Sequence, residues 1–270
     1  MTAAFPEPAW LVGCGNMAGA MVEGWRAGGV DFSGVSVIRP SGTPVEGVRT
    51  VTDYPNERPR FVMLGFKPQK LDEIALGLAR HVGTNTVLVS MLAGVTAATL
   101  RQRFPEASAI VRVMPNLPVA QQRGVVALFN ESEDRESVLT VGGLMSELGL
   151  AFTCGDEQSF AAIGAVAGAG PAYVARFADA MARGGEKLGL DATTAEVIAV
   201  QTLVGTGALI EATGASMADV ARRVASPKGT TEQGLAVLDA ADGLRPLVEK
   251  TLAAAFRRGQ ELAEETARRD

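Results

Sequence analysis

Short apolar runs alternate with helical patterns through the first 155 residues of the chain, and this alternation constrains the fold more than any other feature. The runs show little polar alternation of their own, which is typical of strands buried on both faces of a sheet. Strands that alternate with helices favour parallel pairing in a doubly wound α/β sheet. The expected strands lie in AWLVGCG, VSVIRPS, RFVMLGFKP, NTVLVSMLAG, SAIVRVMPN, RGVVALFN and LAFTCG, with helices over 17–27, 69–82, 96–104 and 133–149.

The strand signals stop near Gly155, and helical patterns then continue to the end of the chain. This change predicts two domains, an α/β domain over residues 1–155 and an all-α domain over residues 156–270. Its expected helices cover 156–167, 171–188, 193–213, 216–224, 231–241 and 246–269. Two apolar stretches, 160–182 and 197–210, fall short of the ~20 strongly apolar residues of a membrane span. We interpret both as buried helices.

The charge balance and the cysteine count exclude several kinds of partner and site. The net charge is −5, so we expect no binding to nucleic acid and none to a membrane. Cys14 and Cys154 fit neither a disulfide framework nor a metal site, which is typical of a cytoplasmic protein. The first residues, MTAAFPEPAW, lack a basic start and a long apolar core, so we expect no signal peptide.

A glycine-rich turn follows the first expected strand. Gly13 allows a tight turn, and Gly15 lets the backbone approach a pyrophosphate, whose charge is favoured at a helix N-terminus. We assign the third small residue of the pattern to Gly19 or Ala20. Because the turn belongs to the first strand of an alternating series, we interpret it as the dinucleotide loop of a Rossmann-like domain rather than as an ordinary glycine-rich turn.

The end of the second strand indicates which dinucleotide binds. An NAD site usually places an acidic residue there, to hold the ribose 2′-hydroxyl. Here the strand ends in VIRPSGT without a carboxylate, and Arg39, Ser41 and Thr43 offer a guanidinium and two hydroxyl groups. A guanidinium suits a 2′-phosphate. We therefore expect NADPH as the cofactor, with NADH as the less favoured alternative.

Later strand ends supply further candidates, because ligands of open α/β sheets bind at the carboxyl ends of the strands. The third strand ends at Lys67 and Pro68, and the fourth ends near Ala93. Asn116 stands between two prolines after the fifth strand. Its amide is placed either to hydrogen-bond a nicotinamide carboxamide or to satisfy its own turn.

A second unusual turn, SPKGTT at residues 226–231, separates two helical patterns near the C-terminus. Ser226 or Thr231 is placed to cap a helix, and Gly229 allows the backbone to aim several N–H groups into one concavity. Such amides at a helix N-terminus form a site for a carboxylate or a phosphate. The same residues also suit a plain surface helix cap, and the residues alone do not separate the two interpretations.

Six motifs, in order, give the chain its resemblance to a known family: GCGNM, FKP, AGVT, RVMPNLP, GAGPAYV and SPKGTTEQGL. Together they resemble the pyrroline-5-carboxylate reductases over nearly the whole chain. The resemblance implies a Rossmann domain followed by a helical substrate-binding and dimerisation domain, in homodimers that some members assemble into decamers. It also implies NAD(P)H-dependent reduction of the C=N bond of 1-pyrroline-5-carboxylate to L-proline, the last step of proline biosynthesis.

The same resemblance assigns roles by position. The implied cofactor-binding residues are Gly13, Gly15, Asn16, Met17, Arg39, Ser41, Lys67, Pro68, Ala93 and Asn116. The implied substrate-binding residues are Lys228, Gly229, Thr230 and Thr231, whose backbone N–H groups we expect to bind the substrate carboxylate. Thr231 matches the threonine that hydrogen-bonds the ring nitrogen, so it is the expected catalytic residue. No metal is expected.

Two departures from the family pattern leave the substrate open. Ala167 and Ala169 stand where the family usually has serines, and Lys228 stands where it usually has a glycine. If position 228 requires φ > 0, a lysine there costs ~1 kcal/mol. The alternatives are a reductase of a related cyclic imine carboxylate, such as a six-membered ring, and a non-catalytic NADP-binding regulatory protein. A β-hydroxyacid dehydrogenase is disfavoured, because residues 156–183 lack the lysine that such enzymes use.

Overall fold

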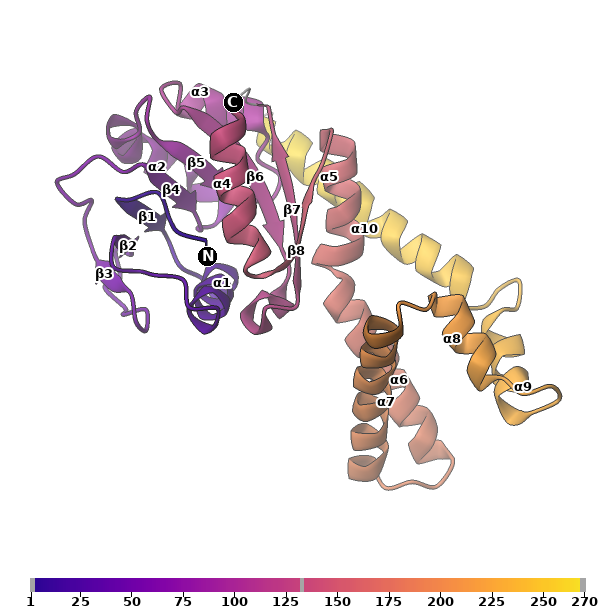
Figure 1. The fold of residues 1–270 in the computed structure, drawn as a ribbon. Helices are drawn as coiled ribbons and strands as arrows, with labels where there is room; N and C mark the ends of the chain where they lie inside the picture. Colours follow the sequence, from indigo (N-terminus) through magenta and orange to yellow (C-terminus); the bar gives the residue numbers. More distant parts are fainter. Residues whose placement is uncertain (1–2, 132–133, 268–270) are drawn as a thin grey trace. The chain divides into compact units, whose positions relative to one another are not determined.

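The computed structural model describes residues 3–131 and 134–267 and divides the chain into two compact units (Figure 1). The first unit contains the residues up to Ala169 together with those from Ala255 onward, and the second contains Gly170–Ala254. These limits differ from the predicted domain boundary after residue 155, which remains a prediction. The ends of two predicted helices, at residue 133 and at residues 268–269, lie outside the described residues.

The first unit is built on one eight-stranded sheet in the order β3-β2-β1-β4-β5-β6-β7-β8. All neighbouring strands are parallel except β6 and β7. The predicted doubly wound α/β class is therefore confirmed. The strands are β1 (Ala9–Val12), β2 (Val35–Ile38), β3 (Arg49–Val51), β4 (Phe61–Leu64), β5 (Val87–Ser90), β6 (Ala109–Pro115), β7 (Gly124–Asn130) and β8 (Gly149–Thr153).

Two features of the sheet differ from the sequence expectation. Strand β3 was not predicted, because its three residues are exposed or half-buried and form no apolar run. The expected parallel pairing is wrong for β7, which runs antiparallel to β6. The two strands are joined only by residues 116–123, which contain the short 3₁₀ helix η3 (Leu117–Gln121). A parallel return needs a crossover of a dozen residues or more, so this connection allows only the antiparallel pairing.

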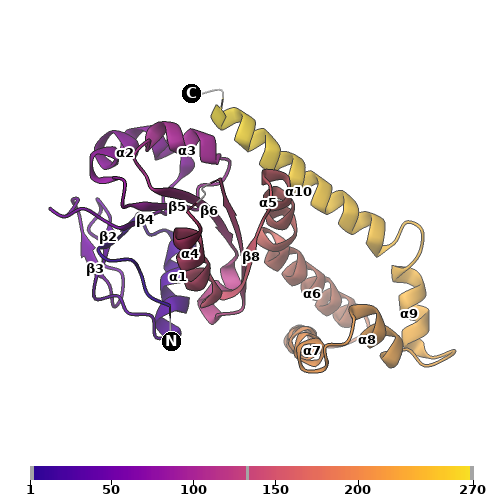
Figure 2. The same ribbon diagram turned by 45° about the horizontal axis from the view of Figure 1, so that its top comes forward.

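Helices cover both faces of the sheet, as Figure 2 shows. Helices α1 (Asn16–Ala27) and α4 (Arg135–Ser146) pack on one face around Trp25 and Leu144. Helices α2 (Leu71–Leu78) and α3 (Ala97–Arg103) pack on the other face around Leu78 and Leu100. Fully buried strands between two helical layers explain why their sequences are continuous apolar runs.

Helix α5 (Glu157–Ile163) and a π-helical turn (Gly164–Gly168) follow the sheet and belong to the first unit. Arg112 of β6 forms an ion pair with Glu157 in which only the arginine is buried, and the Arg112 guanidinium lies 4.6 Å from the Phe160 ring centroid. A Cβ added at Gly164 would lie 2.5 Å from the Met114 sulfur, so this glycine allows the turn to pack against the end of β6. These contacts fix the start of the helical region to the sheet.

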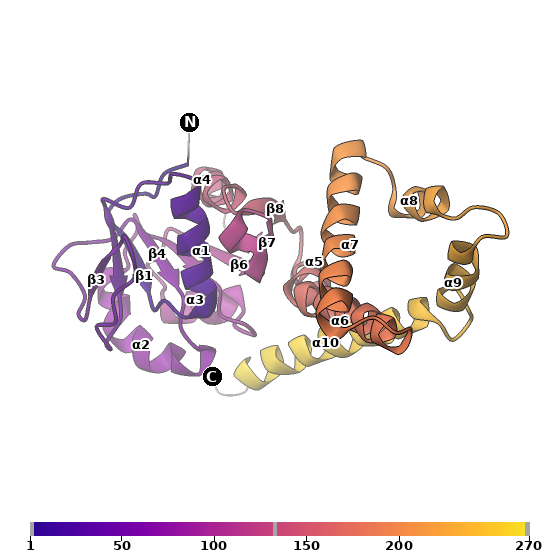
Figure 3. The ribbon, with the colours of Figure 1, turned by 90° about the horizontal axis from the view of Figure 1, so that it is seen from below.

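The second unit is entirely helical (Figure 3). It contains α6 (Gly170–Lys187), α7 (Ala192–Thr213), α8 (Met217–Val224), α9 (Thr230–Leu238) and the first part of α10 (Leu244–Ala267). Helices α6 and α7 pack closely through the small residues Ala182, Ala195 and Ala199. Asp191 and Ser216 cap α7 and α8 by accepting hydrogen bonds from Thr194 N–H and Asp219 N–H.

The apolar stretches of this region are exposed in the single chain. Two helical segments, Glu157–Lys187 and Ala192–Thr213, are long and apolar enough to cross a membrane by length and composition, and only 11% of each apolar window is buried. The prediction that both are buried helices is therefore wrong for one isolated chain. A large exposed apolar surface indicates a partner or a membrane.

Candidate functional site

The predicted cofactor residues all follow parallel strands, at one edge of the sheet. In-register pairing aligns Val12 with Ile38 and Leu64, and it aligns Leu64 with Ser90. The chain segments that leave these strands are therefore neighbours at the carboxyl edge. The structure brings together at this edge Gly13, Gly15, Asn16 and Met17 after β1, Arg39 and Ser41 after β2, Lys67 and Pro68 after β4, Ala93 after β5 and Asn116 after β6.

Two glycines meet where β1 and β4 end. Gly13 has φ +81°, and a Cβ added to it would lie 2.9 Å from the carbonyl oxygen of Gly65. A Cβ added to Gly65 would lie 2.8 Å from the carbonyl oxygen of Gly13. The left-handed conformation and the close approach both require glycine at residue 13. The backbone therefore turns here directly into α1.

Helix α1 presents an open N-terminus at this edge. Its N-cap is Gly15, no side chain caps it, and its first turn has no acidic residue. A Cβ added to Gly15 would have no protein atom within 4 Å, so the space beside this backbone is open. Unpaired N–H groups and the helix dipole favour an anion at such a position. The geometry is that of a pyrophosphate-binding loop.

The third small residue of the glycine pattern is Ala18, and the assignment to Gly19 or Ala20 was wrong. Ala18 is 1% exposed, and its Cβ packs close to Gly65. An added Cβ at Gly19 would have no neighbour within 4 Å, so that glycine serves no close contact. Gly13, Gly15 and Ala18 have the spacing of the Rossmann fingerprint, in which the third position accepts alanine.

Arg39 lies beside the glycine loop. Burial raises the pKa of the Cys14 thiol, and the positive charge of Arg39 opposes that shift. The Arg39 guanidinium donates one hydrogen bond, from Nη1 to the Thr43 carbonyl oxygen at 3.2 Å. The hydroxyl oxygens of Ser41 and Thr43 are 3.0 Å apart and exposed. A cation and two hydroxyl groups, with no carboxylate at the end of β2, match a phosphate better than a ribose hydroxyl.

The Asn116 side chain is already engaged by the protein. It is 6% exposed, its Nδ2 donates to the Ala167 carbonyl oxygen at 2.9 Å, and its Oδ1 accepts from Val125 N–H at 2.8 Å. The amide thus joins the start of β7 to the π-helical turn. Asn116 therefore has a structural role, although its partners lie in β7 and the π-helical turn rather than in its own turn. A contact with nicotinamide would have to use the second Nδ2 hydrogen or the second Oδ1 lone pair.

The SPKGTT turn in the second unit leads into helix α9. The N-cap is Gly229, and no side chain caps the helix, so the expected cap by Ser226 or Thr231 is wrong. A Cβ added to Gly229 would lie 2.3 Å from Ser226 Oγ, which explains the glycine. Lys228 has φ +58°, so this position is left-handed as the family glycine suggested. The lysine holds that conformation at a cost of ~1 kcal/mol.

Two of the four amides assigned to the substrate carboxylate have partners in this structure. Lys228 N–H donates to Glu232 Oε2 at 2.6 Å, and Gly229 N–H donates to the Ser226 carbonyl oxygen at 2.9 Å. Thr230 and Thr231 are the first two residues of α9, and N–H groups at these positions have no intrahelical acceptor. The anion-binding capacity of the turn therefore lies with Thr230 and Thr231.

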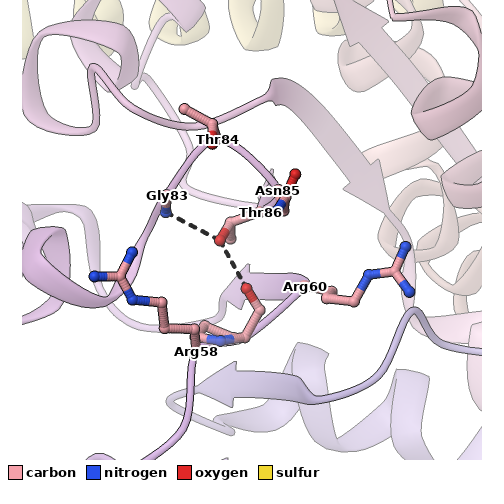
Figure 4. A pocket seen from close by; sticks show the side chains of 7 residues that line it. Arg58, Arg60, Gly83, Thr84, Asn85 and Thr86 are labelled. Atoms are coloured by element: carbon pink, nitrogen blue, oxygen red, sulfur yellow. Dashed lines mark hydrogen bonds between the residues drawn. The ribbon is translucent and has the colours of Figure 1, made fainter.

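A pocket elsewhere on the sheet does not belong to this site. It is lined by Arg58–Arg60 and Gly83–Thr86, which precede β4 and β5 and so lie at the amino edge. Thr86 Oγ1 donates to the Pro59 carbonyl oxygen at 2.7 Å and accepts from Gly83 N–H at 3.1 Å. The guanidinium groups of Arg58 and Arg60 point away from one another (Figure 4). Among the described residues, no cluster of three or more His, Cys, Asp or Glu side chains could hold a metal.

Comparison with known proteins identifies the family. The profile described as pyrroline-5-carboxylate reductase dimerisation matches residues 157–262. A pyrroline-5-carboxylate reductase of Pseudomonas aeruginosa is 32% identical over 264 residues, which cover 94% of this chain and 96% of the relative. Pyrroline-5-carboxylate reductase 3 of Danio rerio is also 32% identical, over 93% of this chain and 90% of its own. This chain belongs to the pyrroline-5-carboxylate reductase family.

Solved structures agree with that assignment. The pyrroline-5-carboxylate reductase of Coxiella burnetii has a TM-score of 0.87 and 30% identity, over 96% of this chain and 99% of that one. The NADP-bound pyrroline carboxylate reductase of Plasmodium falciparum has a TM-score of 0.82 and 19% identity, over 94% and 97% of the two chains, so it shows the shared fold. The predicted Rossmann-like sheet followed by a helical region is confirmed.

The position of Arg39 generates a test of cofactor choice. Replacing Arg39 by alanine removes the only guanidinium that we assign to the 2′-phosphate, so the KM for NADPH should rise about tenfold while the KM for NADH changes little. Steady-state kinetics with each cofactor measures the effect. Arg58→Ala, at the amino edge, is the matched control. An equal rise in both KM values for Arg39→Ala would contradict the assignment.

Proposed function

We propose that the chain reduces the C=N bond of 1-pyrroline-5-carboxylate to L-proline, with NADPH as the preferred donor and NADH as a weaker one. The observation that carries this proposal is the family match over nearly the full chain, together with an intact dinucleotide loop at the carboxyl edge of the sheet. The missing acidic residue after β2 supports NADPH. Reduction of this imine is the last step of proline biosynthesis, and we place it in the cytoplasm.

The first unit would hold the cofactor. Backbone N–H groups at the start of α1 bind the pyrophosphate, and Arg39 with Ser41 binds the adenosine phosphate. Lys67, Pro68 and Ala93 border the same edge, and Asn116 keeps the end of β6 in place against β7. When bound, the reduced nicotinamide supplies the hydride. The cofactor therefore supplies the chemistry, and the protein binds and orients the reactants.

The SPKGTT turn would bind the substrate. The N–H groups of Thr230 and Thr231 donate hydrogen bonds to the carboxylate, and the α9 dipole favours its charge. One carbon separates the carboxylate from the ring nitrogen, so the Thr231 hydroxyl can hydrogen-bond the nitrogen and relay a proton. A protonated imine accepts hydride readily, so the site needs no strong acid. Catalysis here is mainly positioning.

A direct assay tests the proposal. Adding 1-pyrroline-5-carboxylate to the protein and NADPH should produce NADPH oxidation and L-proline, measured at 340 nm and by amino-acid analysis. The six-membered homologue should give a lower kcat/KM than the five-membered imine. No oxidation with either ring would reject the enzyme in favour of a non-catalytic NADP-binding protein. A higher kcat/KM for the larger ring would identify the six-membered imine as the preferred substrate.

Thr231 can be tested with an isosteric pair. Thr231→Val removes the hydroxyl and keeps the shape and the backbone N–H, so kcat/KM should fall about a hundredfold, the low end for a positioned proton donor. Thr231→Ser keeps a hydroxyl and should retain most of the activity. The Kd for NADPH should not change in either variant. Wild-type turnover by Thr231→Val would remove Thr231 from the mechanism.

We also propose that the chain works as a homodimer. Apolar side chains of α6 and α7 are exposed in the single chain, among them Val174, Phe177, Met181, Val197, Val200 and Val204. They lie inside the segment that matches the dimerisation profile. A partner chain that covers this surface removes it from water, which is the main source of stability in obligate dimers.

Light scattering measures the assembly. The mass in solution should be at least twice the 28.0 kDa of one chain. Val200→Asp would bury a charge in the proposed interface and should shift the protein toward the monomer. Leu139→Asp, on the exposed surface of α4, is the control, because Leu139 is 75% exposed and outside the matched segment. A wild-type monomer at micromolar concentration would contradict the proposal.

A further inference from the structure

Helix α9 begins with a carboxylate that turns back onto the proposed substrate turn. Glu232 Oε2 accepts the N–H of Lys228 at 2.6 Å. That N–H is one of the four that the family resemblance assigns to the carboxylate of the substrate. In this chain a carboxylate of the protein occupies it.

The contact differs from an ordinary helix cap. In a capping box, the glutamate at the third helical position accepts the N–H of the N-cap residue. Here Glu232 is the third residue of α9 and Gly229 is the N-cap, but Gly229 N–H already donates to the Ser226 carbonyl oxygen. Glu232 reaches one residue further, to Lys228. Lys228 has the left-handed conformation in this turn.

The contact opposes substrate binding in two ways. One N–H group forms one strong hydrogen bond, so the substrate cannot use the Lys228 amide while Glu232 holds it. A substrate carboxylate on the Thr230 and Thr231 amides would also lie at the same helix end as the Glu232 carboxylate. Two like charges at one helix N-terminus repel each other and share the same dipole.

We propose that Glu232 is a specificity-determining residue that competes with the substrate carboxylate for the SPKGTT turn. The proposal rests on the proposed function, because it requires that this turn binds the anionic imine. Glu232 keeps the turn ordered when it is empty and raises the KM for a carboxylated substrate. Glu232 does not affect hydride transfer to the C=N bond itself.

The test compares two imines that differ in the carboxylate. In Glu232→Gln the side chain keeps its size but loses its charge, so kcat/KM for 1-pyrroline-5-carboxylate should rise about threefold to fivefold through KM, the range expected for an exposed charge pair. For 1-pyrroline, which lacks the carboxylate, kcat/KM should stay the same. Glu232→Ala should give the same pattern, a higher kcat/KM for 1-pyrroline-5-carboxylate and an unchanged kcat/KM for 1-pyrroline. Glu136→Gln, in the exposed first turn of α4, makes the same change in net charge and should leave both values unchanged.

Three results would count against the proposal in different ways. A lower kcat/KM for 1-pyrroline-5-carboxylate in both Glu232 variants would show that Glu232 helps binding, and it would overturn the competition. An equal change for both imines would show an effect on turn structure and would also overturn it. No NADPH oxidation by the wild type with either imine would reject the proposed function itself. Thermal unfolding of each variant identifies any loss of folded protein.

Discussion

The close approach of Gly13 and Gly65 is the constraint on which the first unit depends. Each glycine lies where a Cβ would come within 3 Å of the other residue's carbonyl oxygen. Only glycine at both positions lets β1 and β4 end side by side, with α1 starting immediately after β1. Ala18, in the first turn of that helix, packs close to Gly65. The position of the α1 N-terminus at the carboxyl edge follows from these three small residues.

Backbone N–H groups at a helix N-terminus, rather than acidic or basic side chains, are the main donors that both candidate sites offer. The start of α1 offers them beside an open space, and the start of α9 offers them at Thr230 and Thr231. Both helices lack a side-chain N-cap. By contrast, α5 and α7 are capped by Asp156 and Asp191, whose pKa values are lowered by the hydrogen bonds that they accept. The uncapped ends of α1 and α9 therefore have N–H groups available for an anionic ligand.

The sequence predicted the parts of this architecture that depend on local patterns. Continuous apolar runs located seven of the eight strands, and the shift to helical patterns located the helical region. Strand β3 was not predicted, because an edge strand of three partly exposed residues has no apolar signature. β7 runs antiparallel to β6 because the connection that begins at Asn116 is short. The alternation of strand and helix patterns alone does not predict this direction.

The candidate sites were predicted less completely, for a different reason. Residue types indicated the glycine loop, Arg39 and the SPKGTT turn, but they did not show which N–H groups are free. Glu232 and Ser226 each accept one N–H group of the turn. The Asn116 side-chain amide is hydrogen-bonded to Val125 and Ala167. Which N–H groups are free depends on hydrogen-bond partners that are close in space. A sequence motif does not identify these partners. Ala18 could have been identified from the sequence, because its spacing from Gly13 fits the fingerprint.

A crystal structure of the protein with NADP⁺ and L-proline tests the central claim most directly, that uncapped helix ends bind the two anionic groups. The account predicts the pyrophosphate at the N-terminus of α1 and the proline carboxylate within hydrogen-bond distance of Thr230 N–H and Thr231 N–H. Proline bound away from residues 226–231, or a dinucleotide bound at the amino edge of the sheet near Arg58 and Arg60, would contradict it.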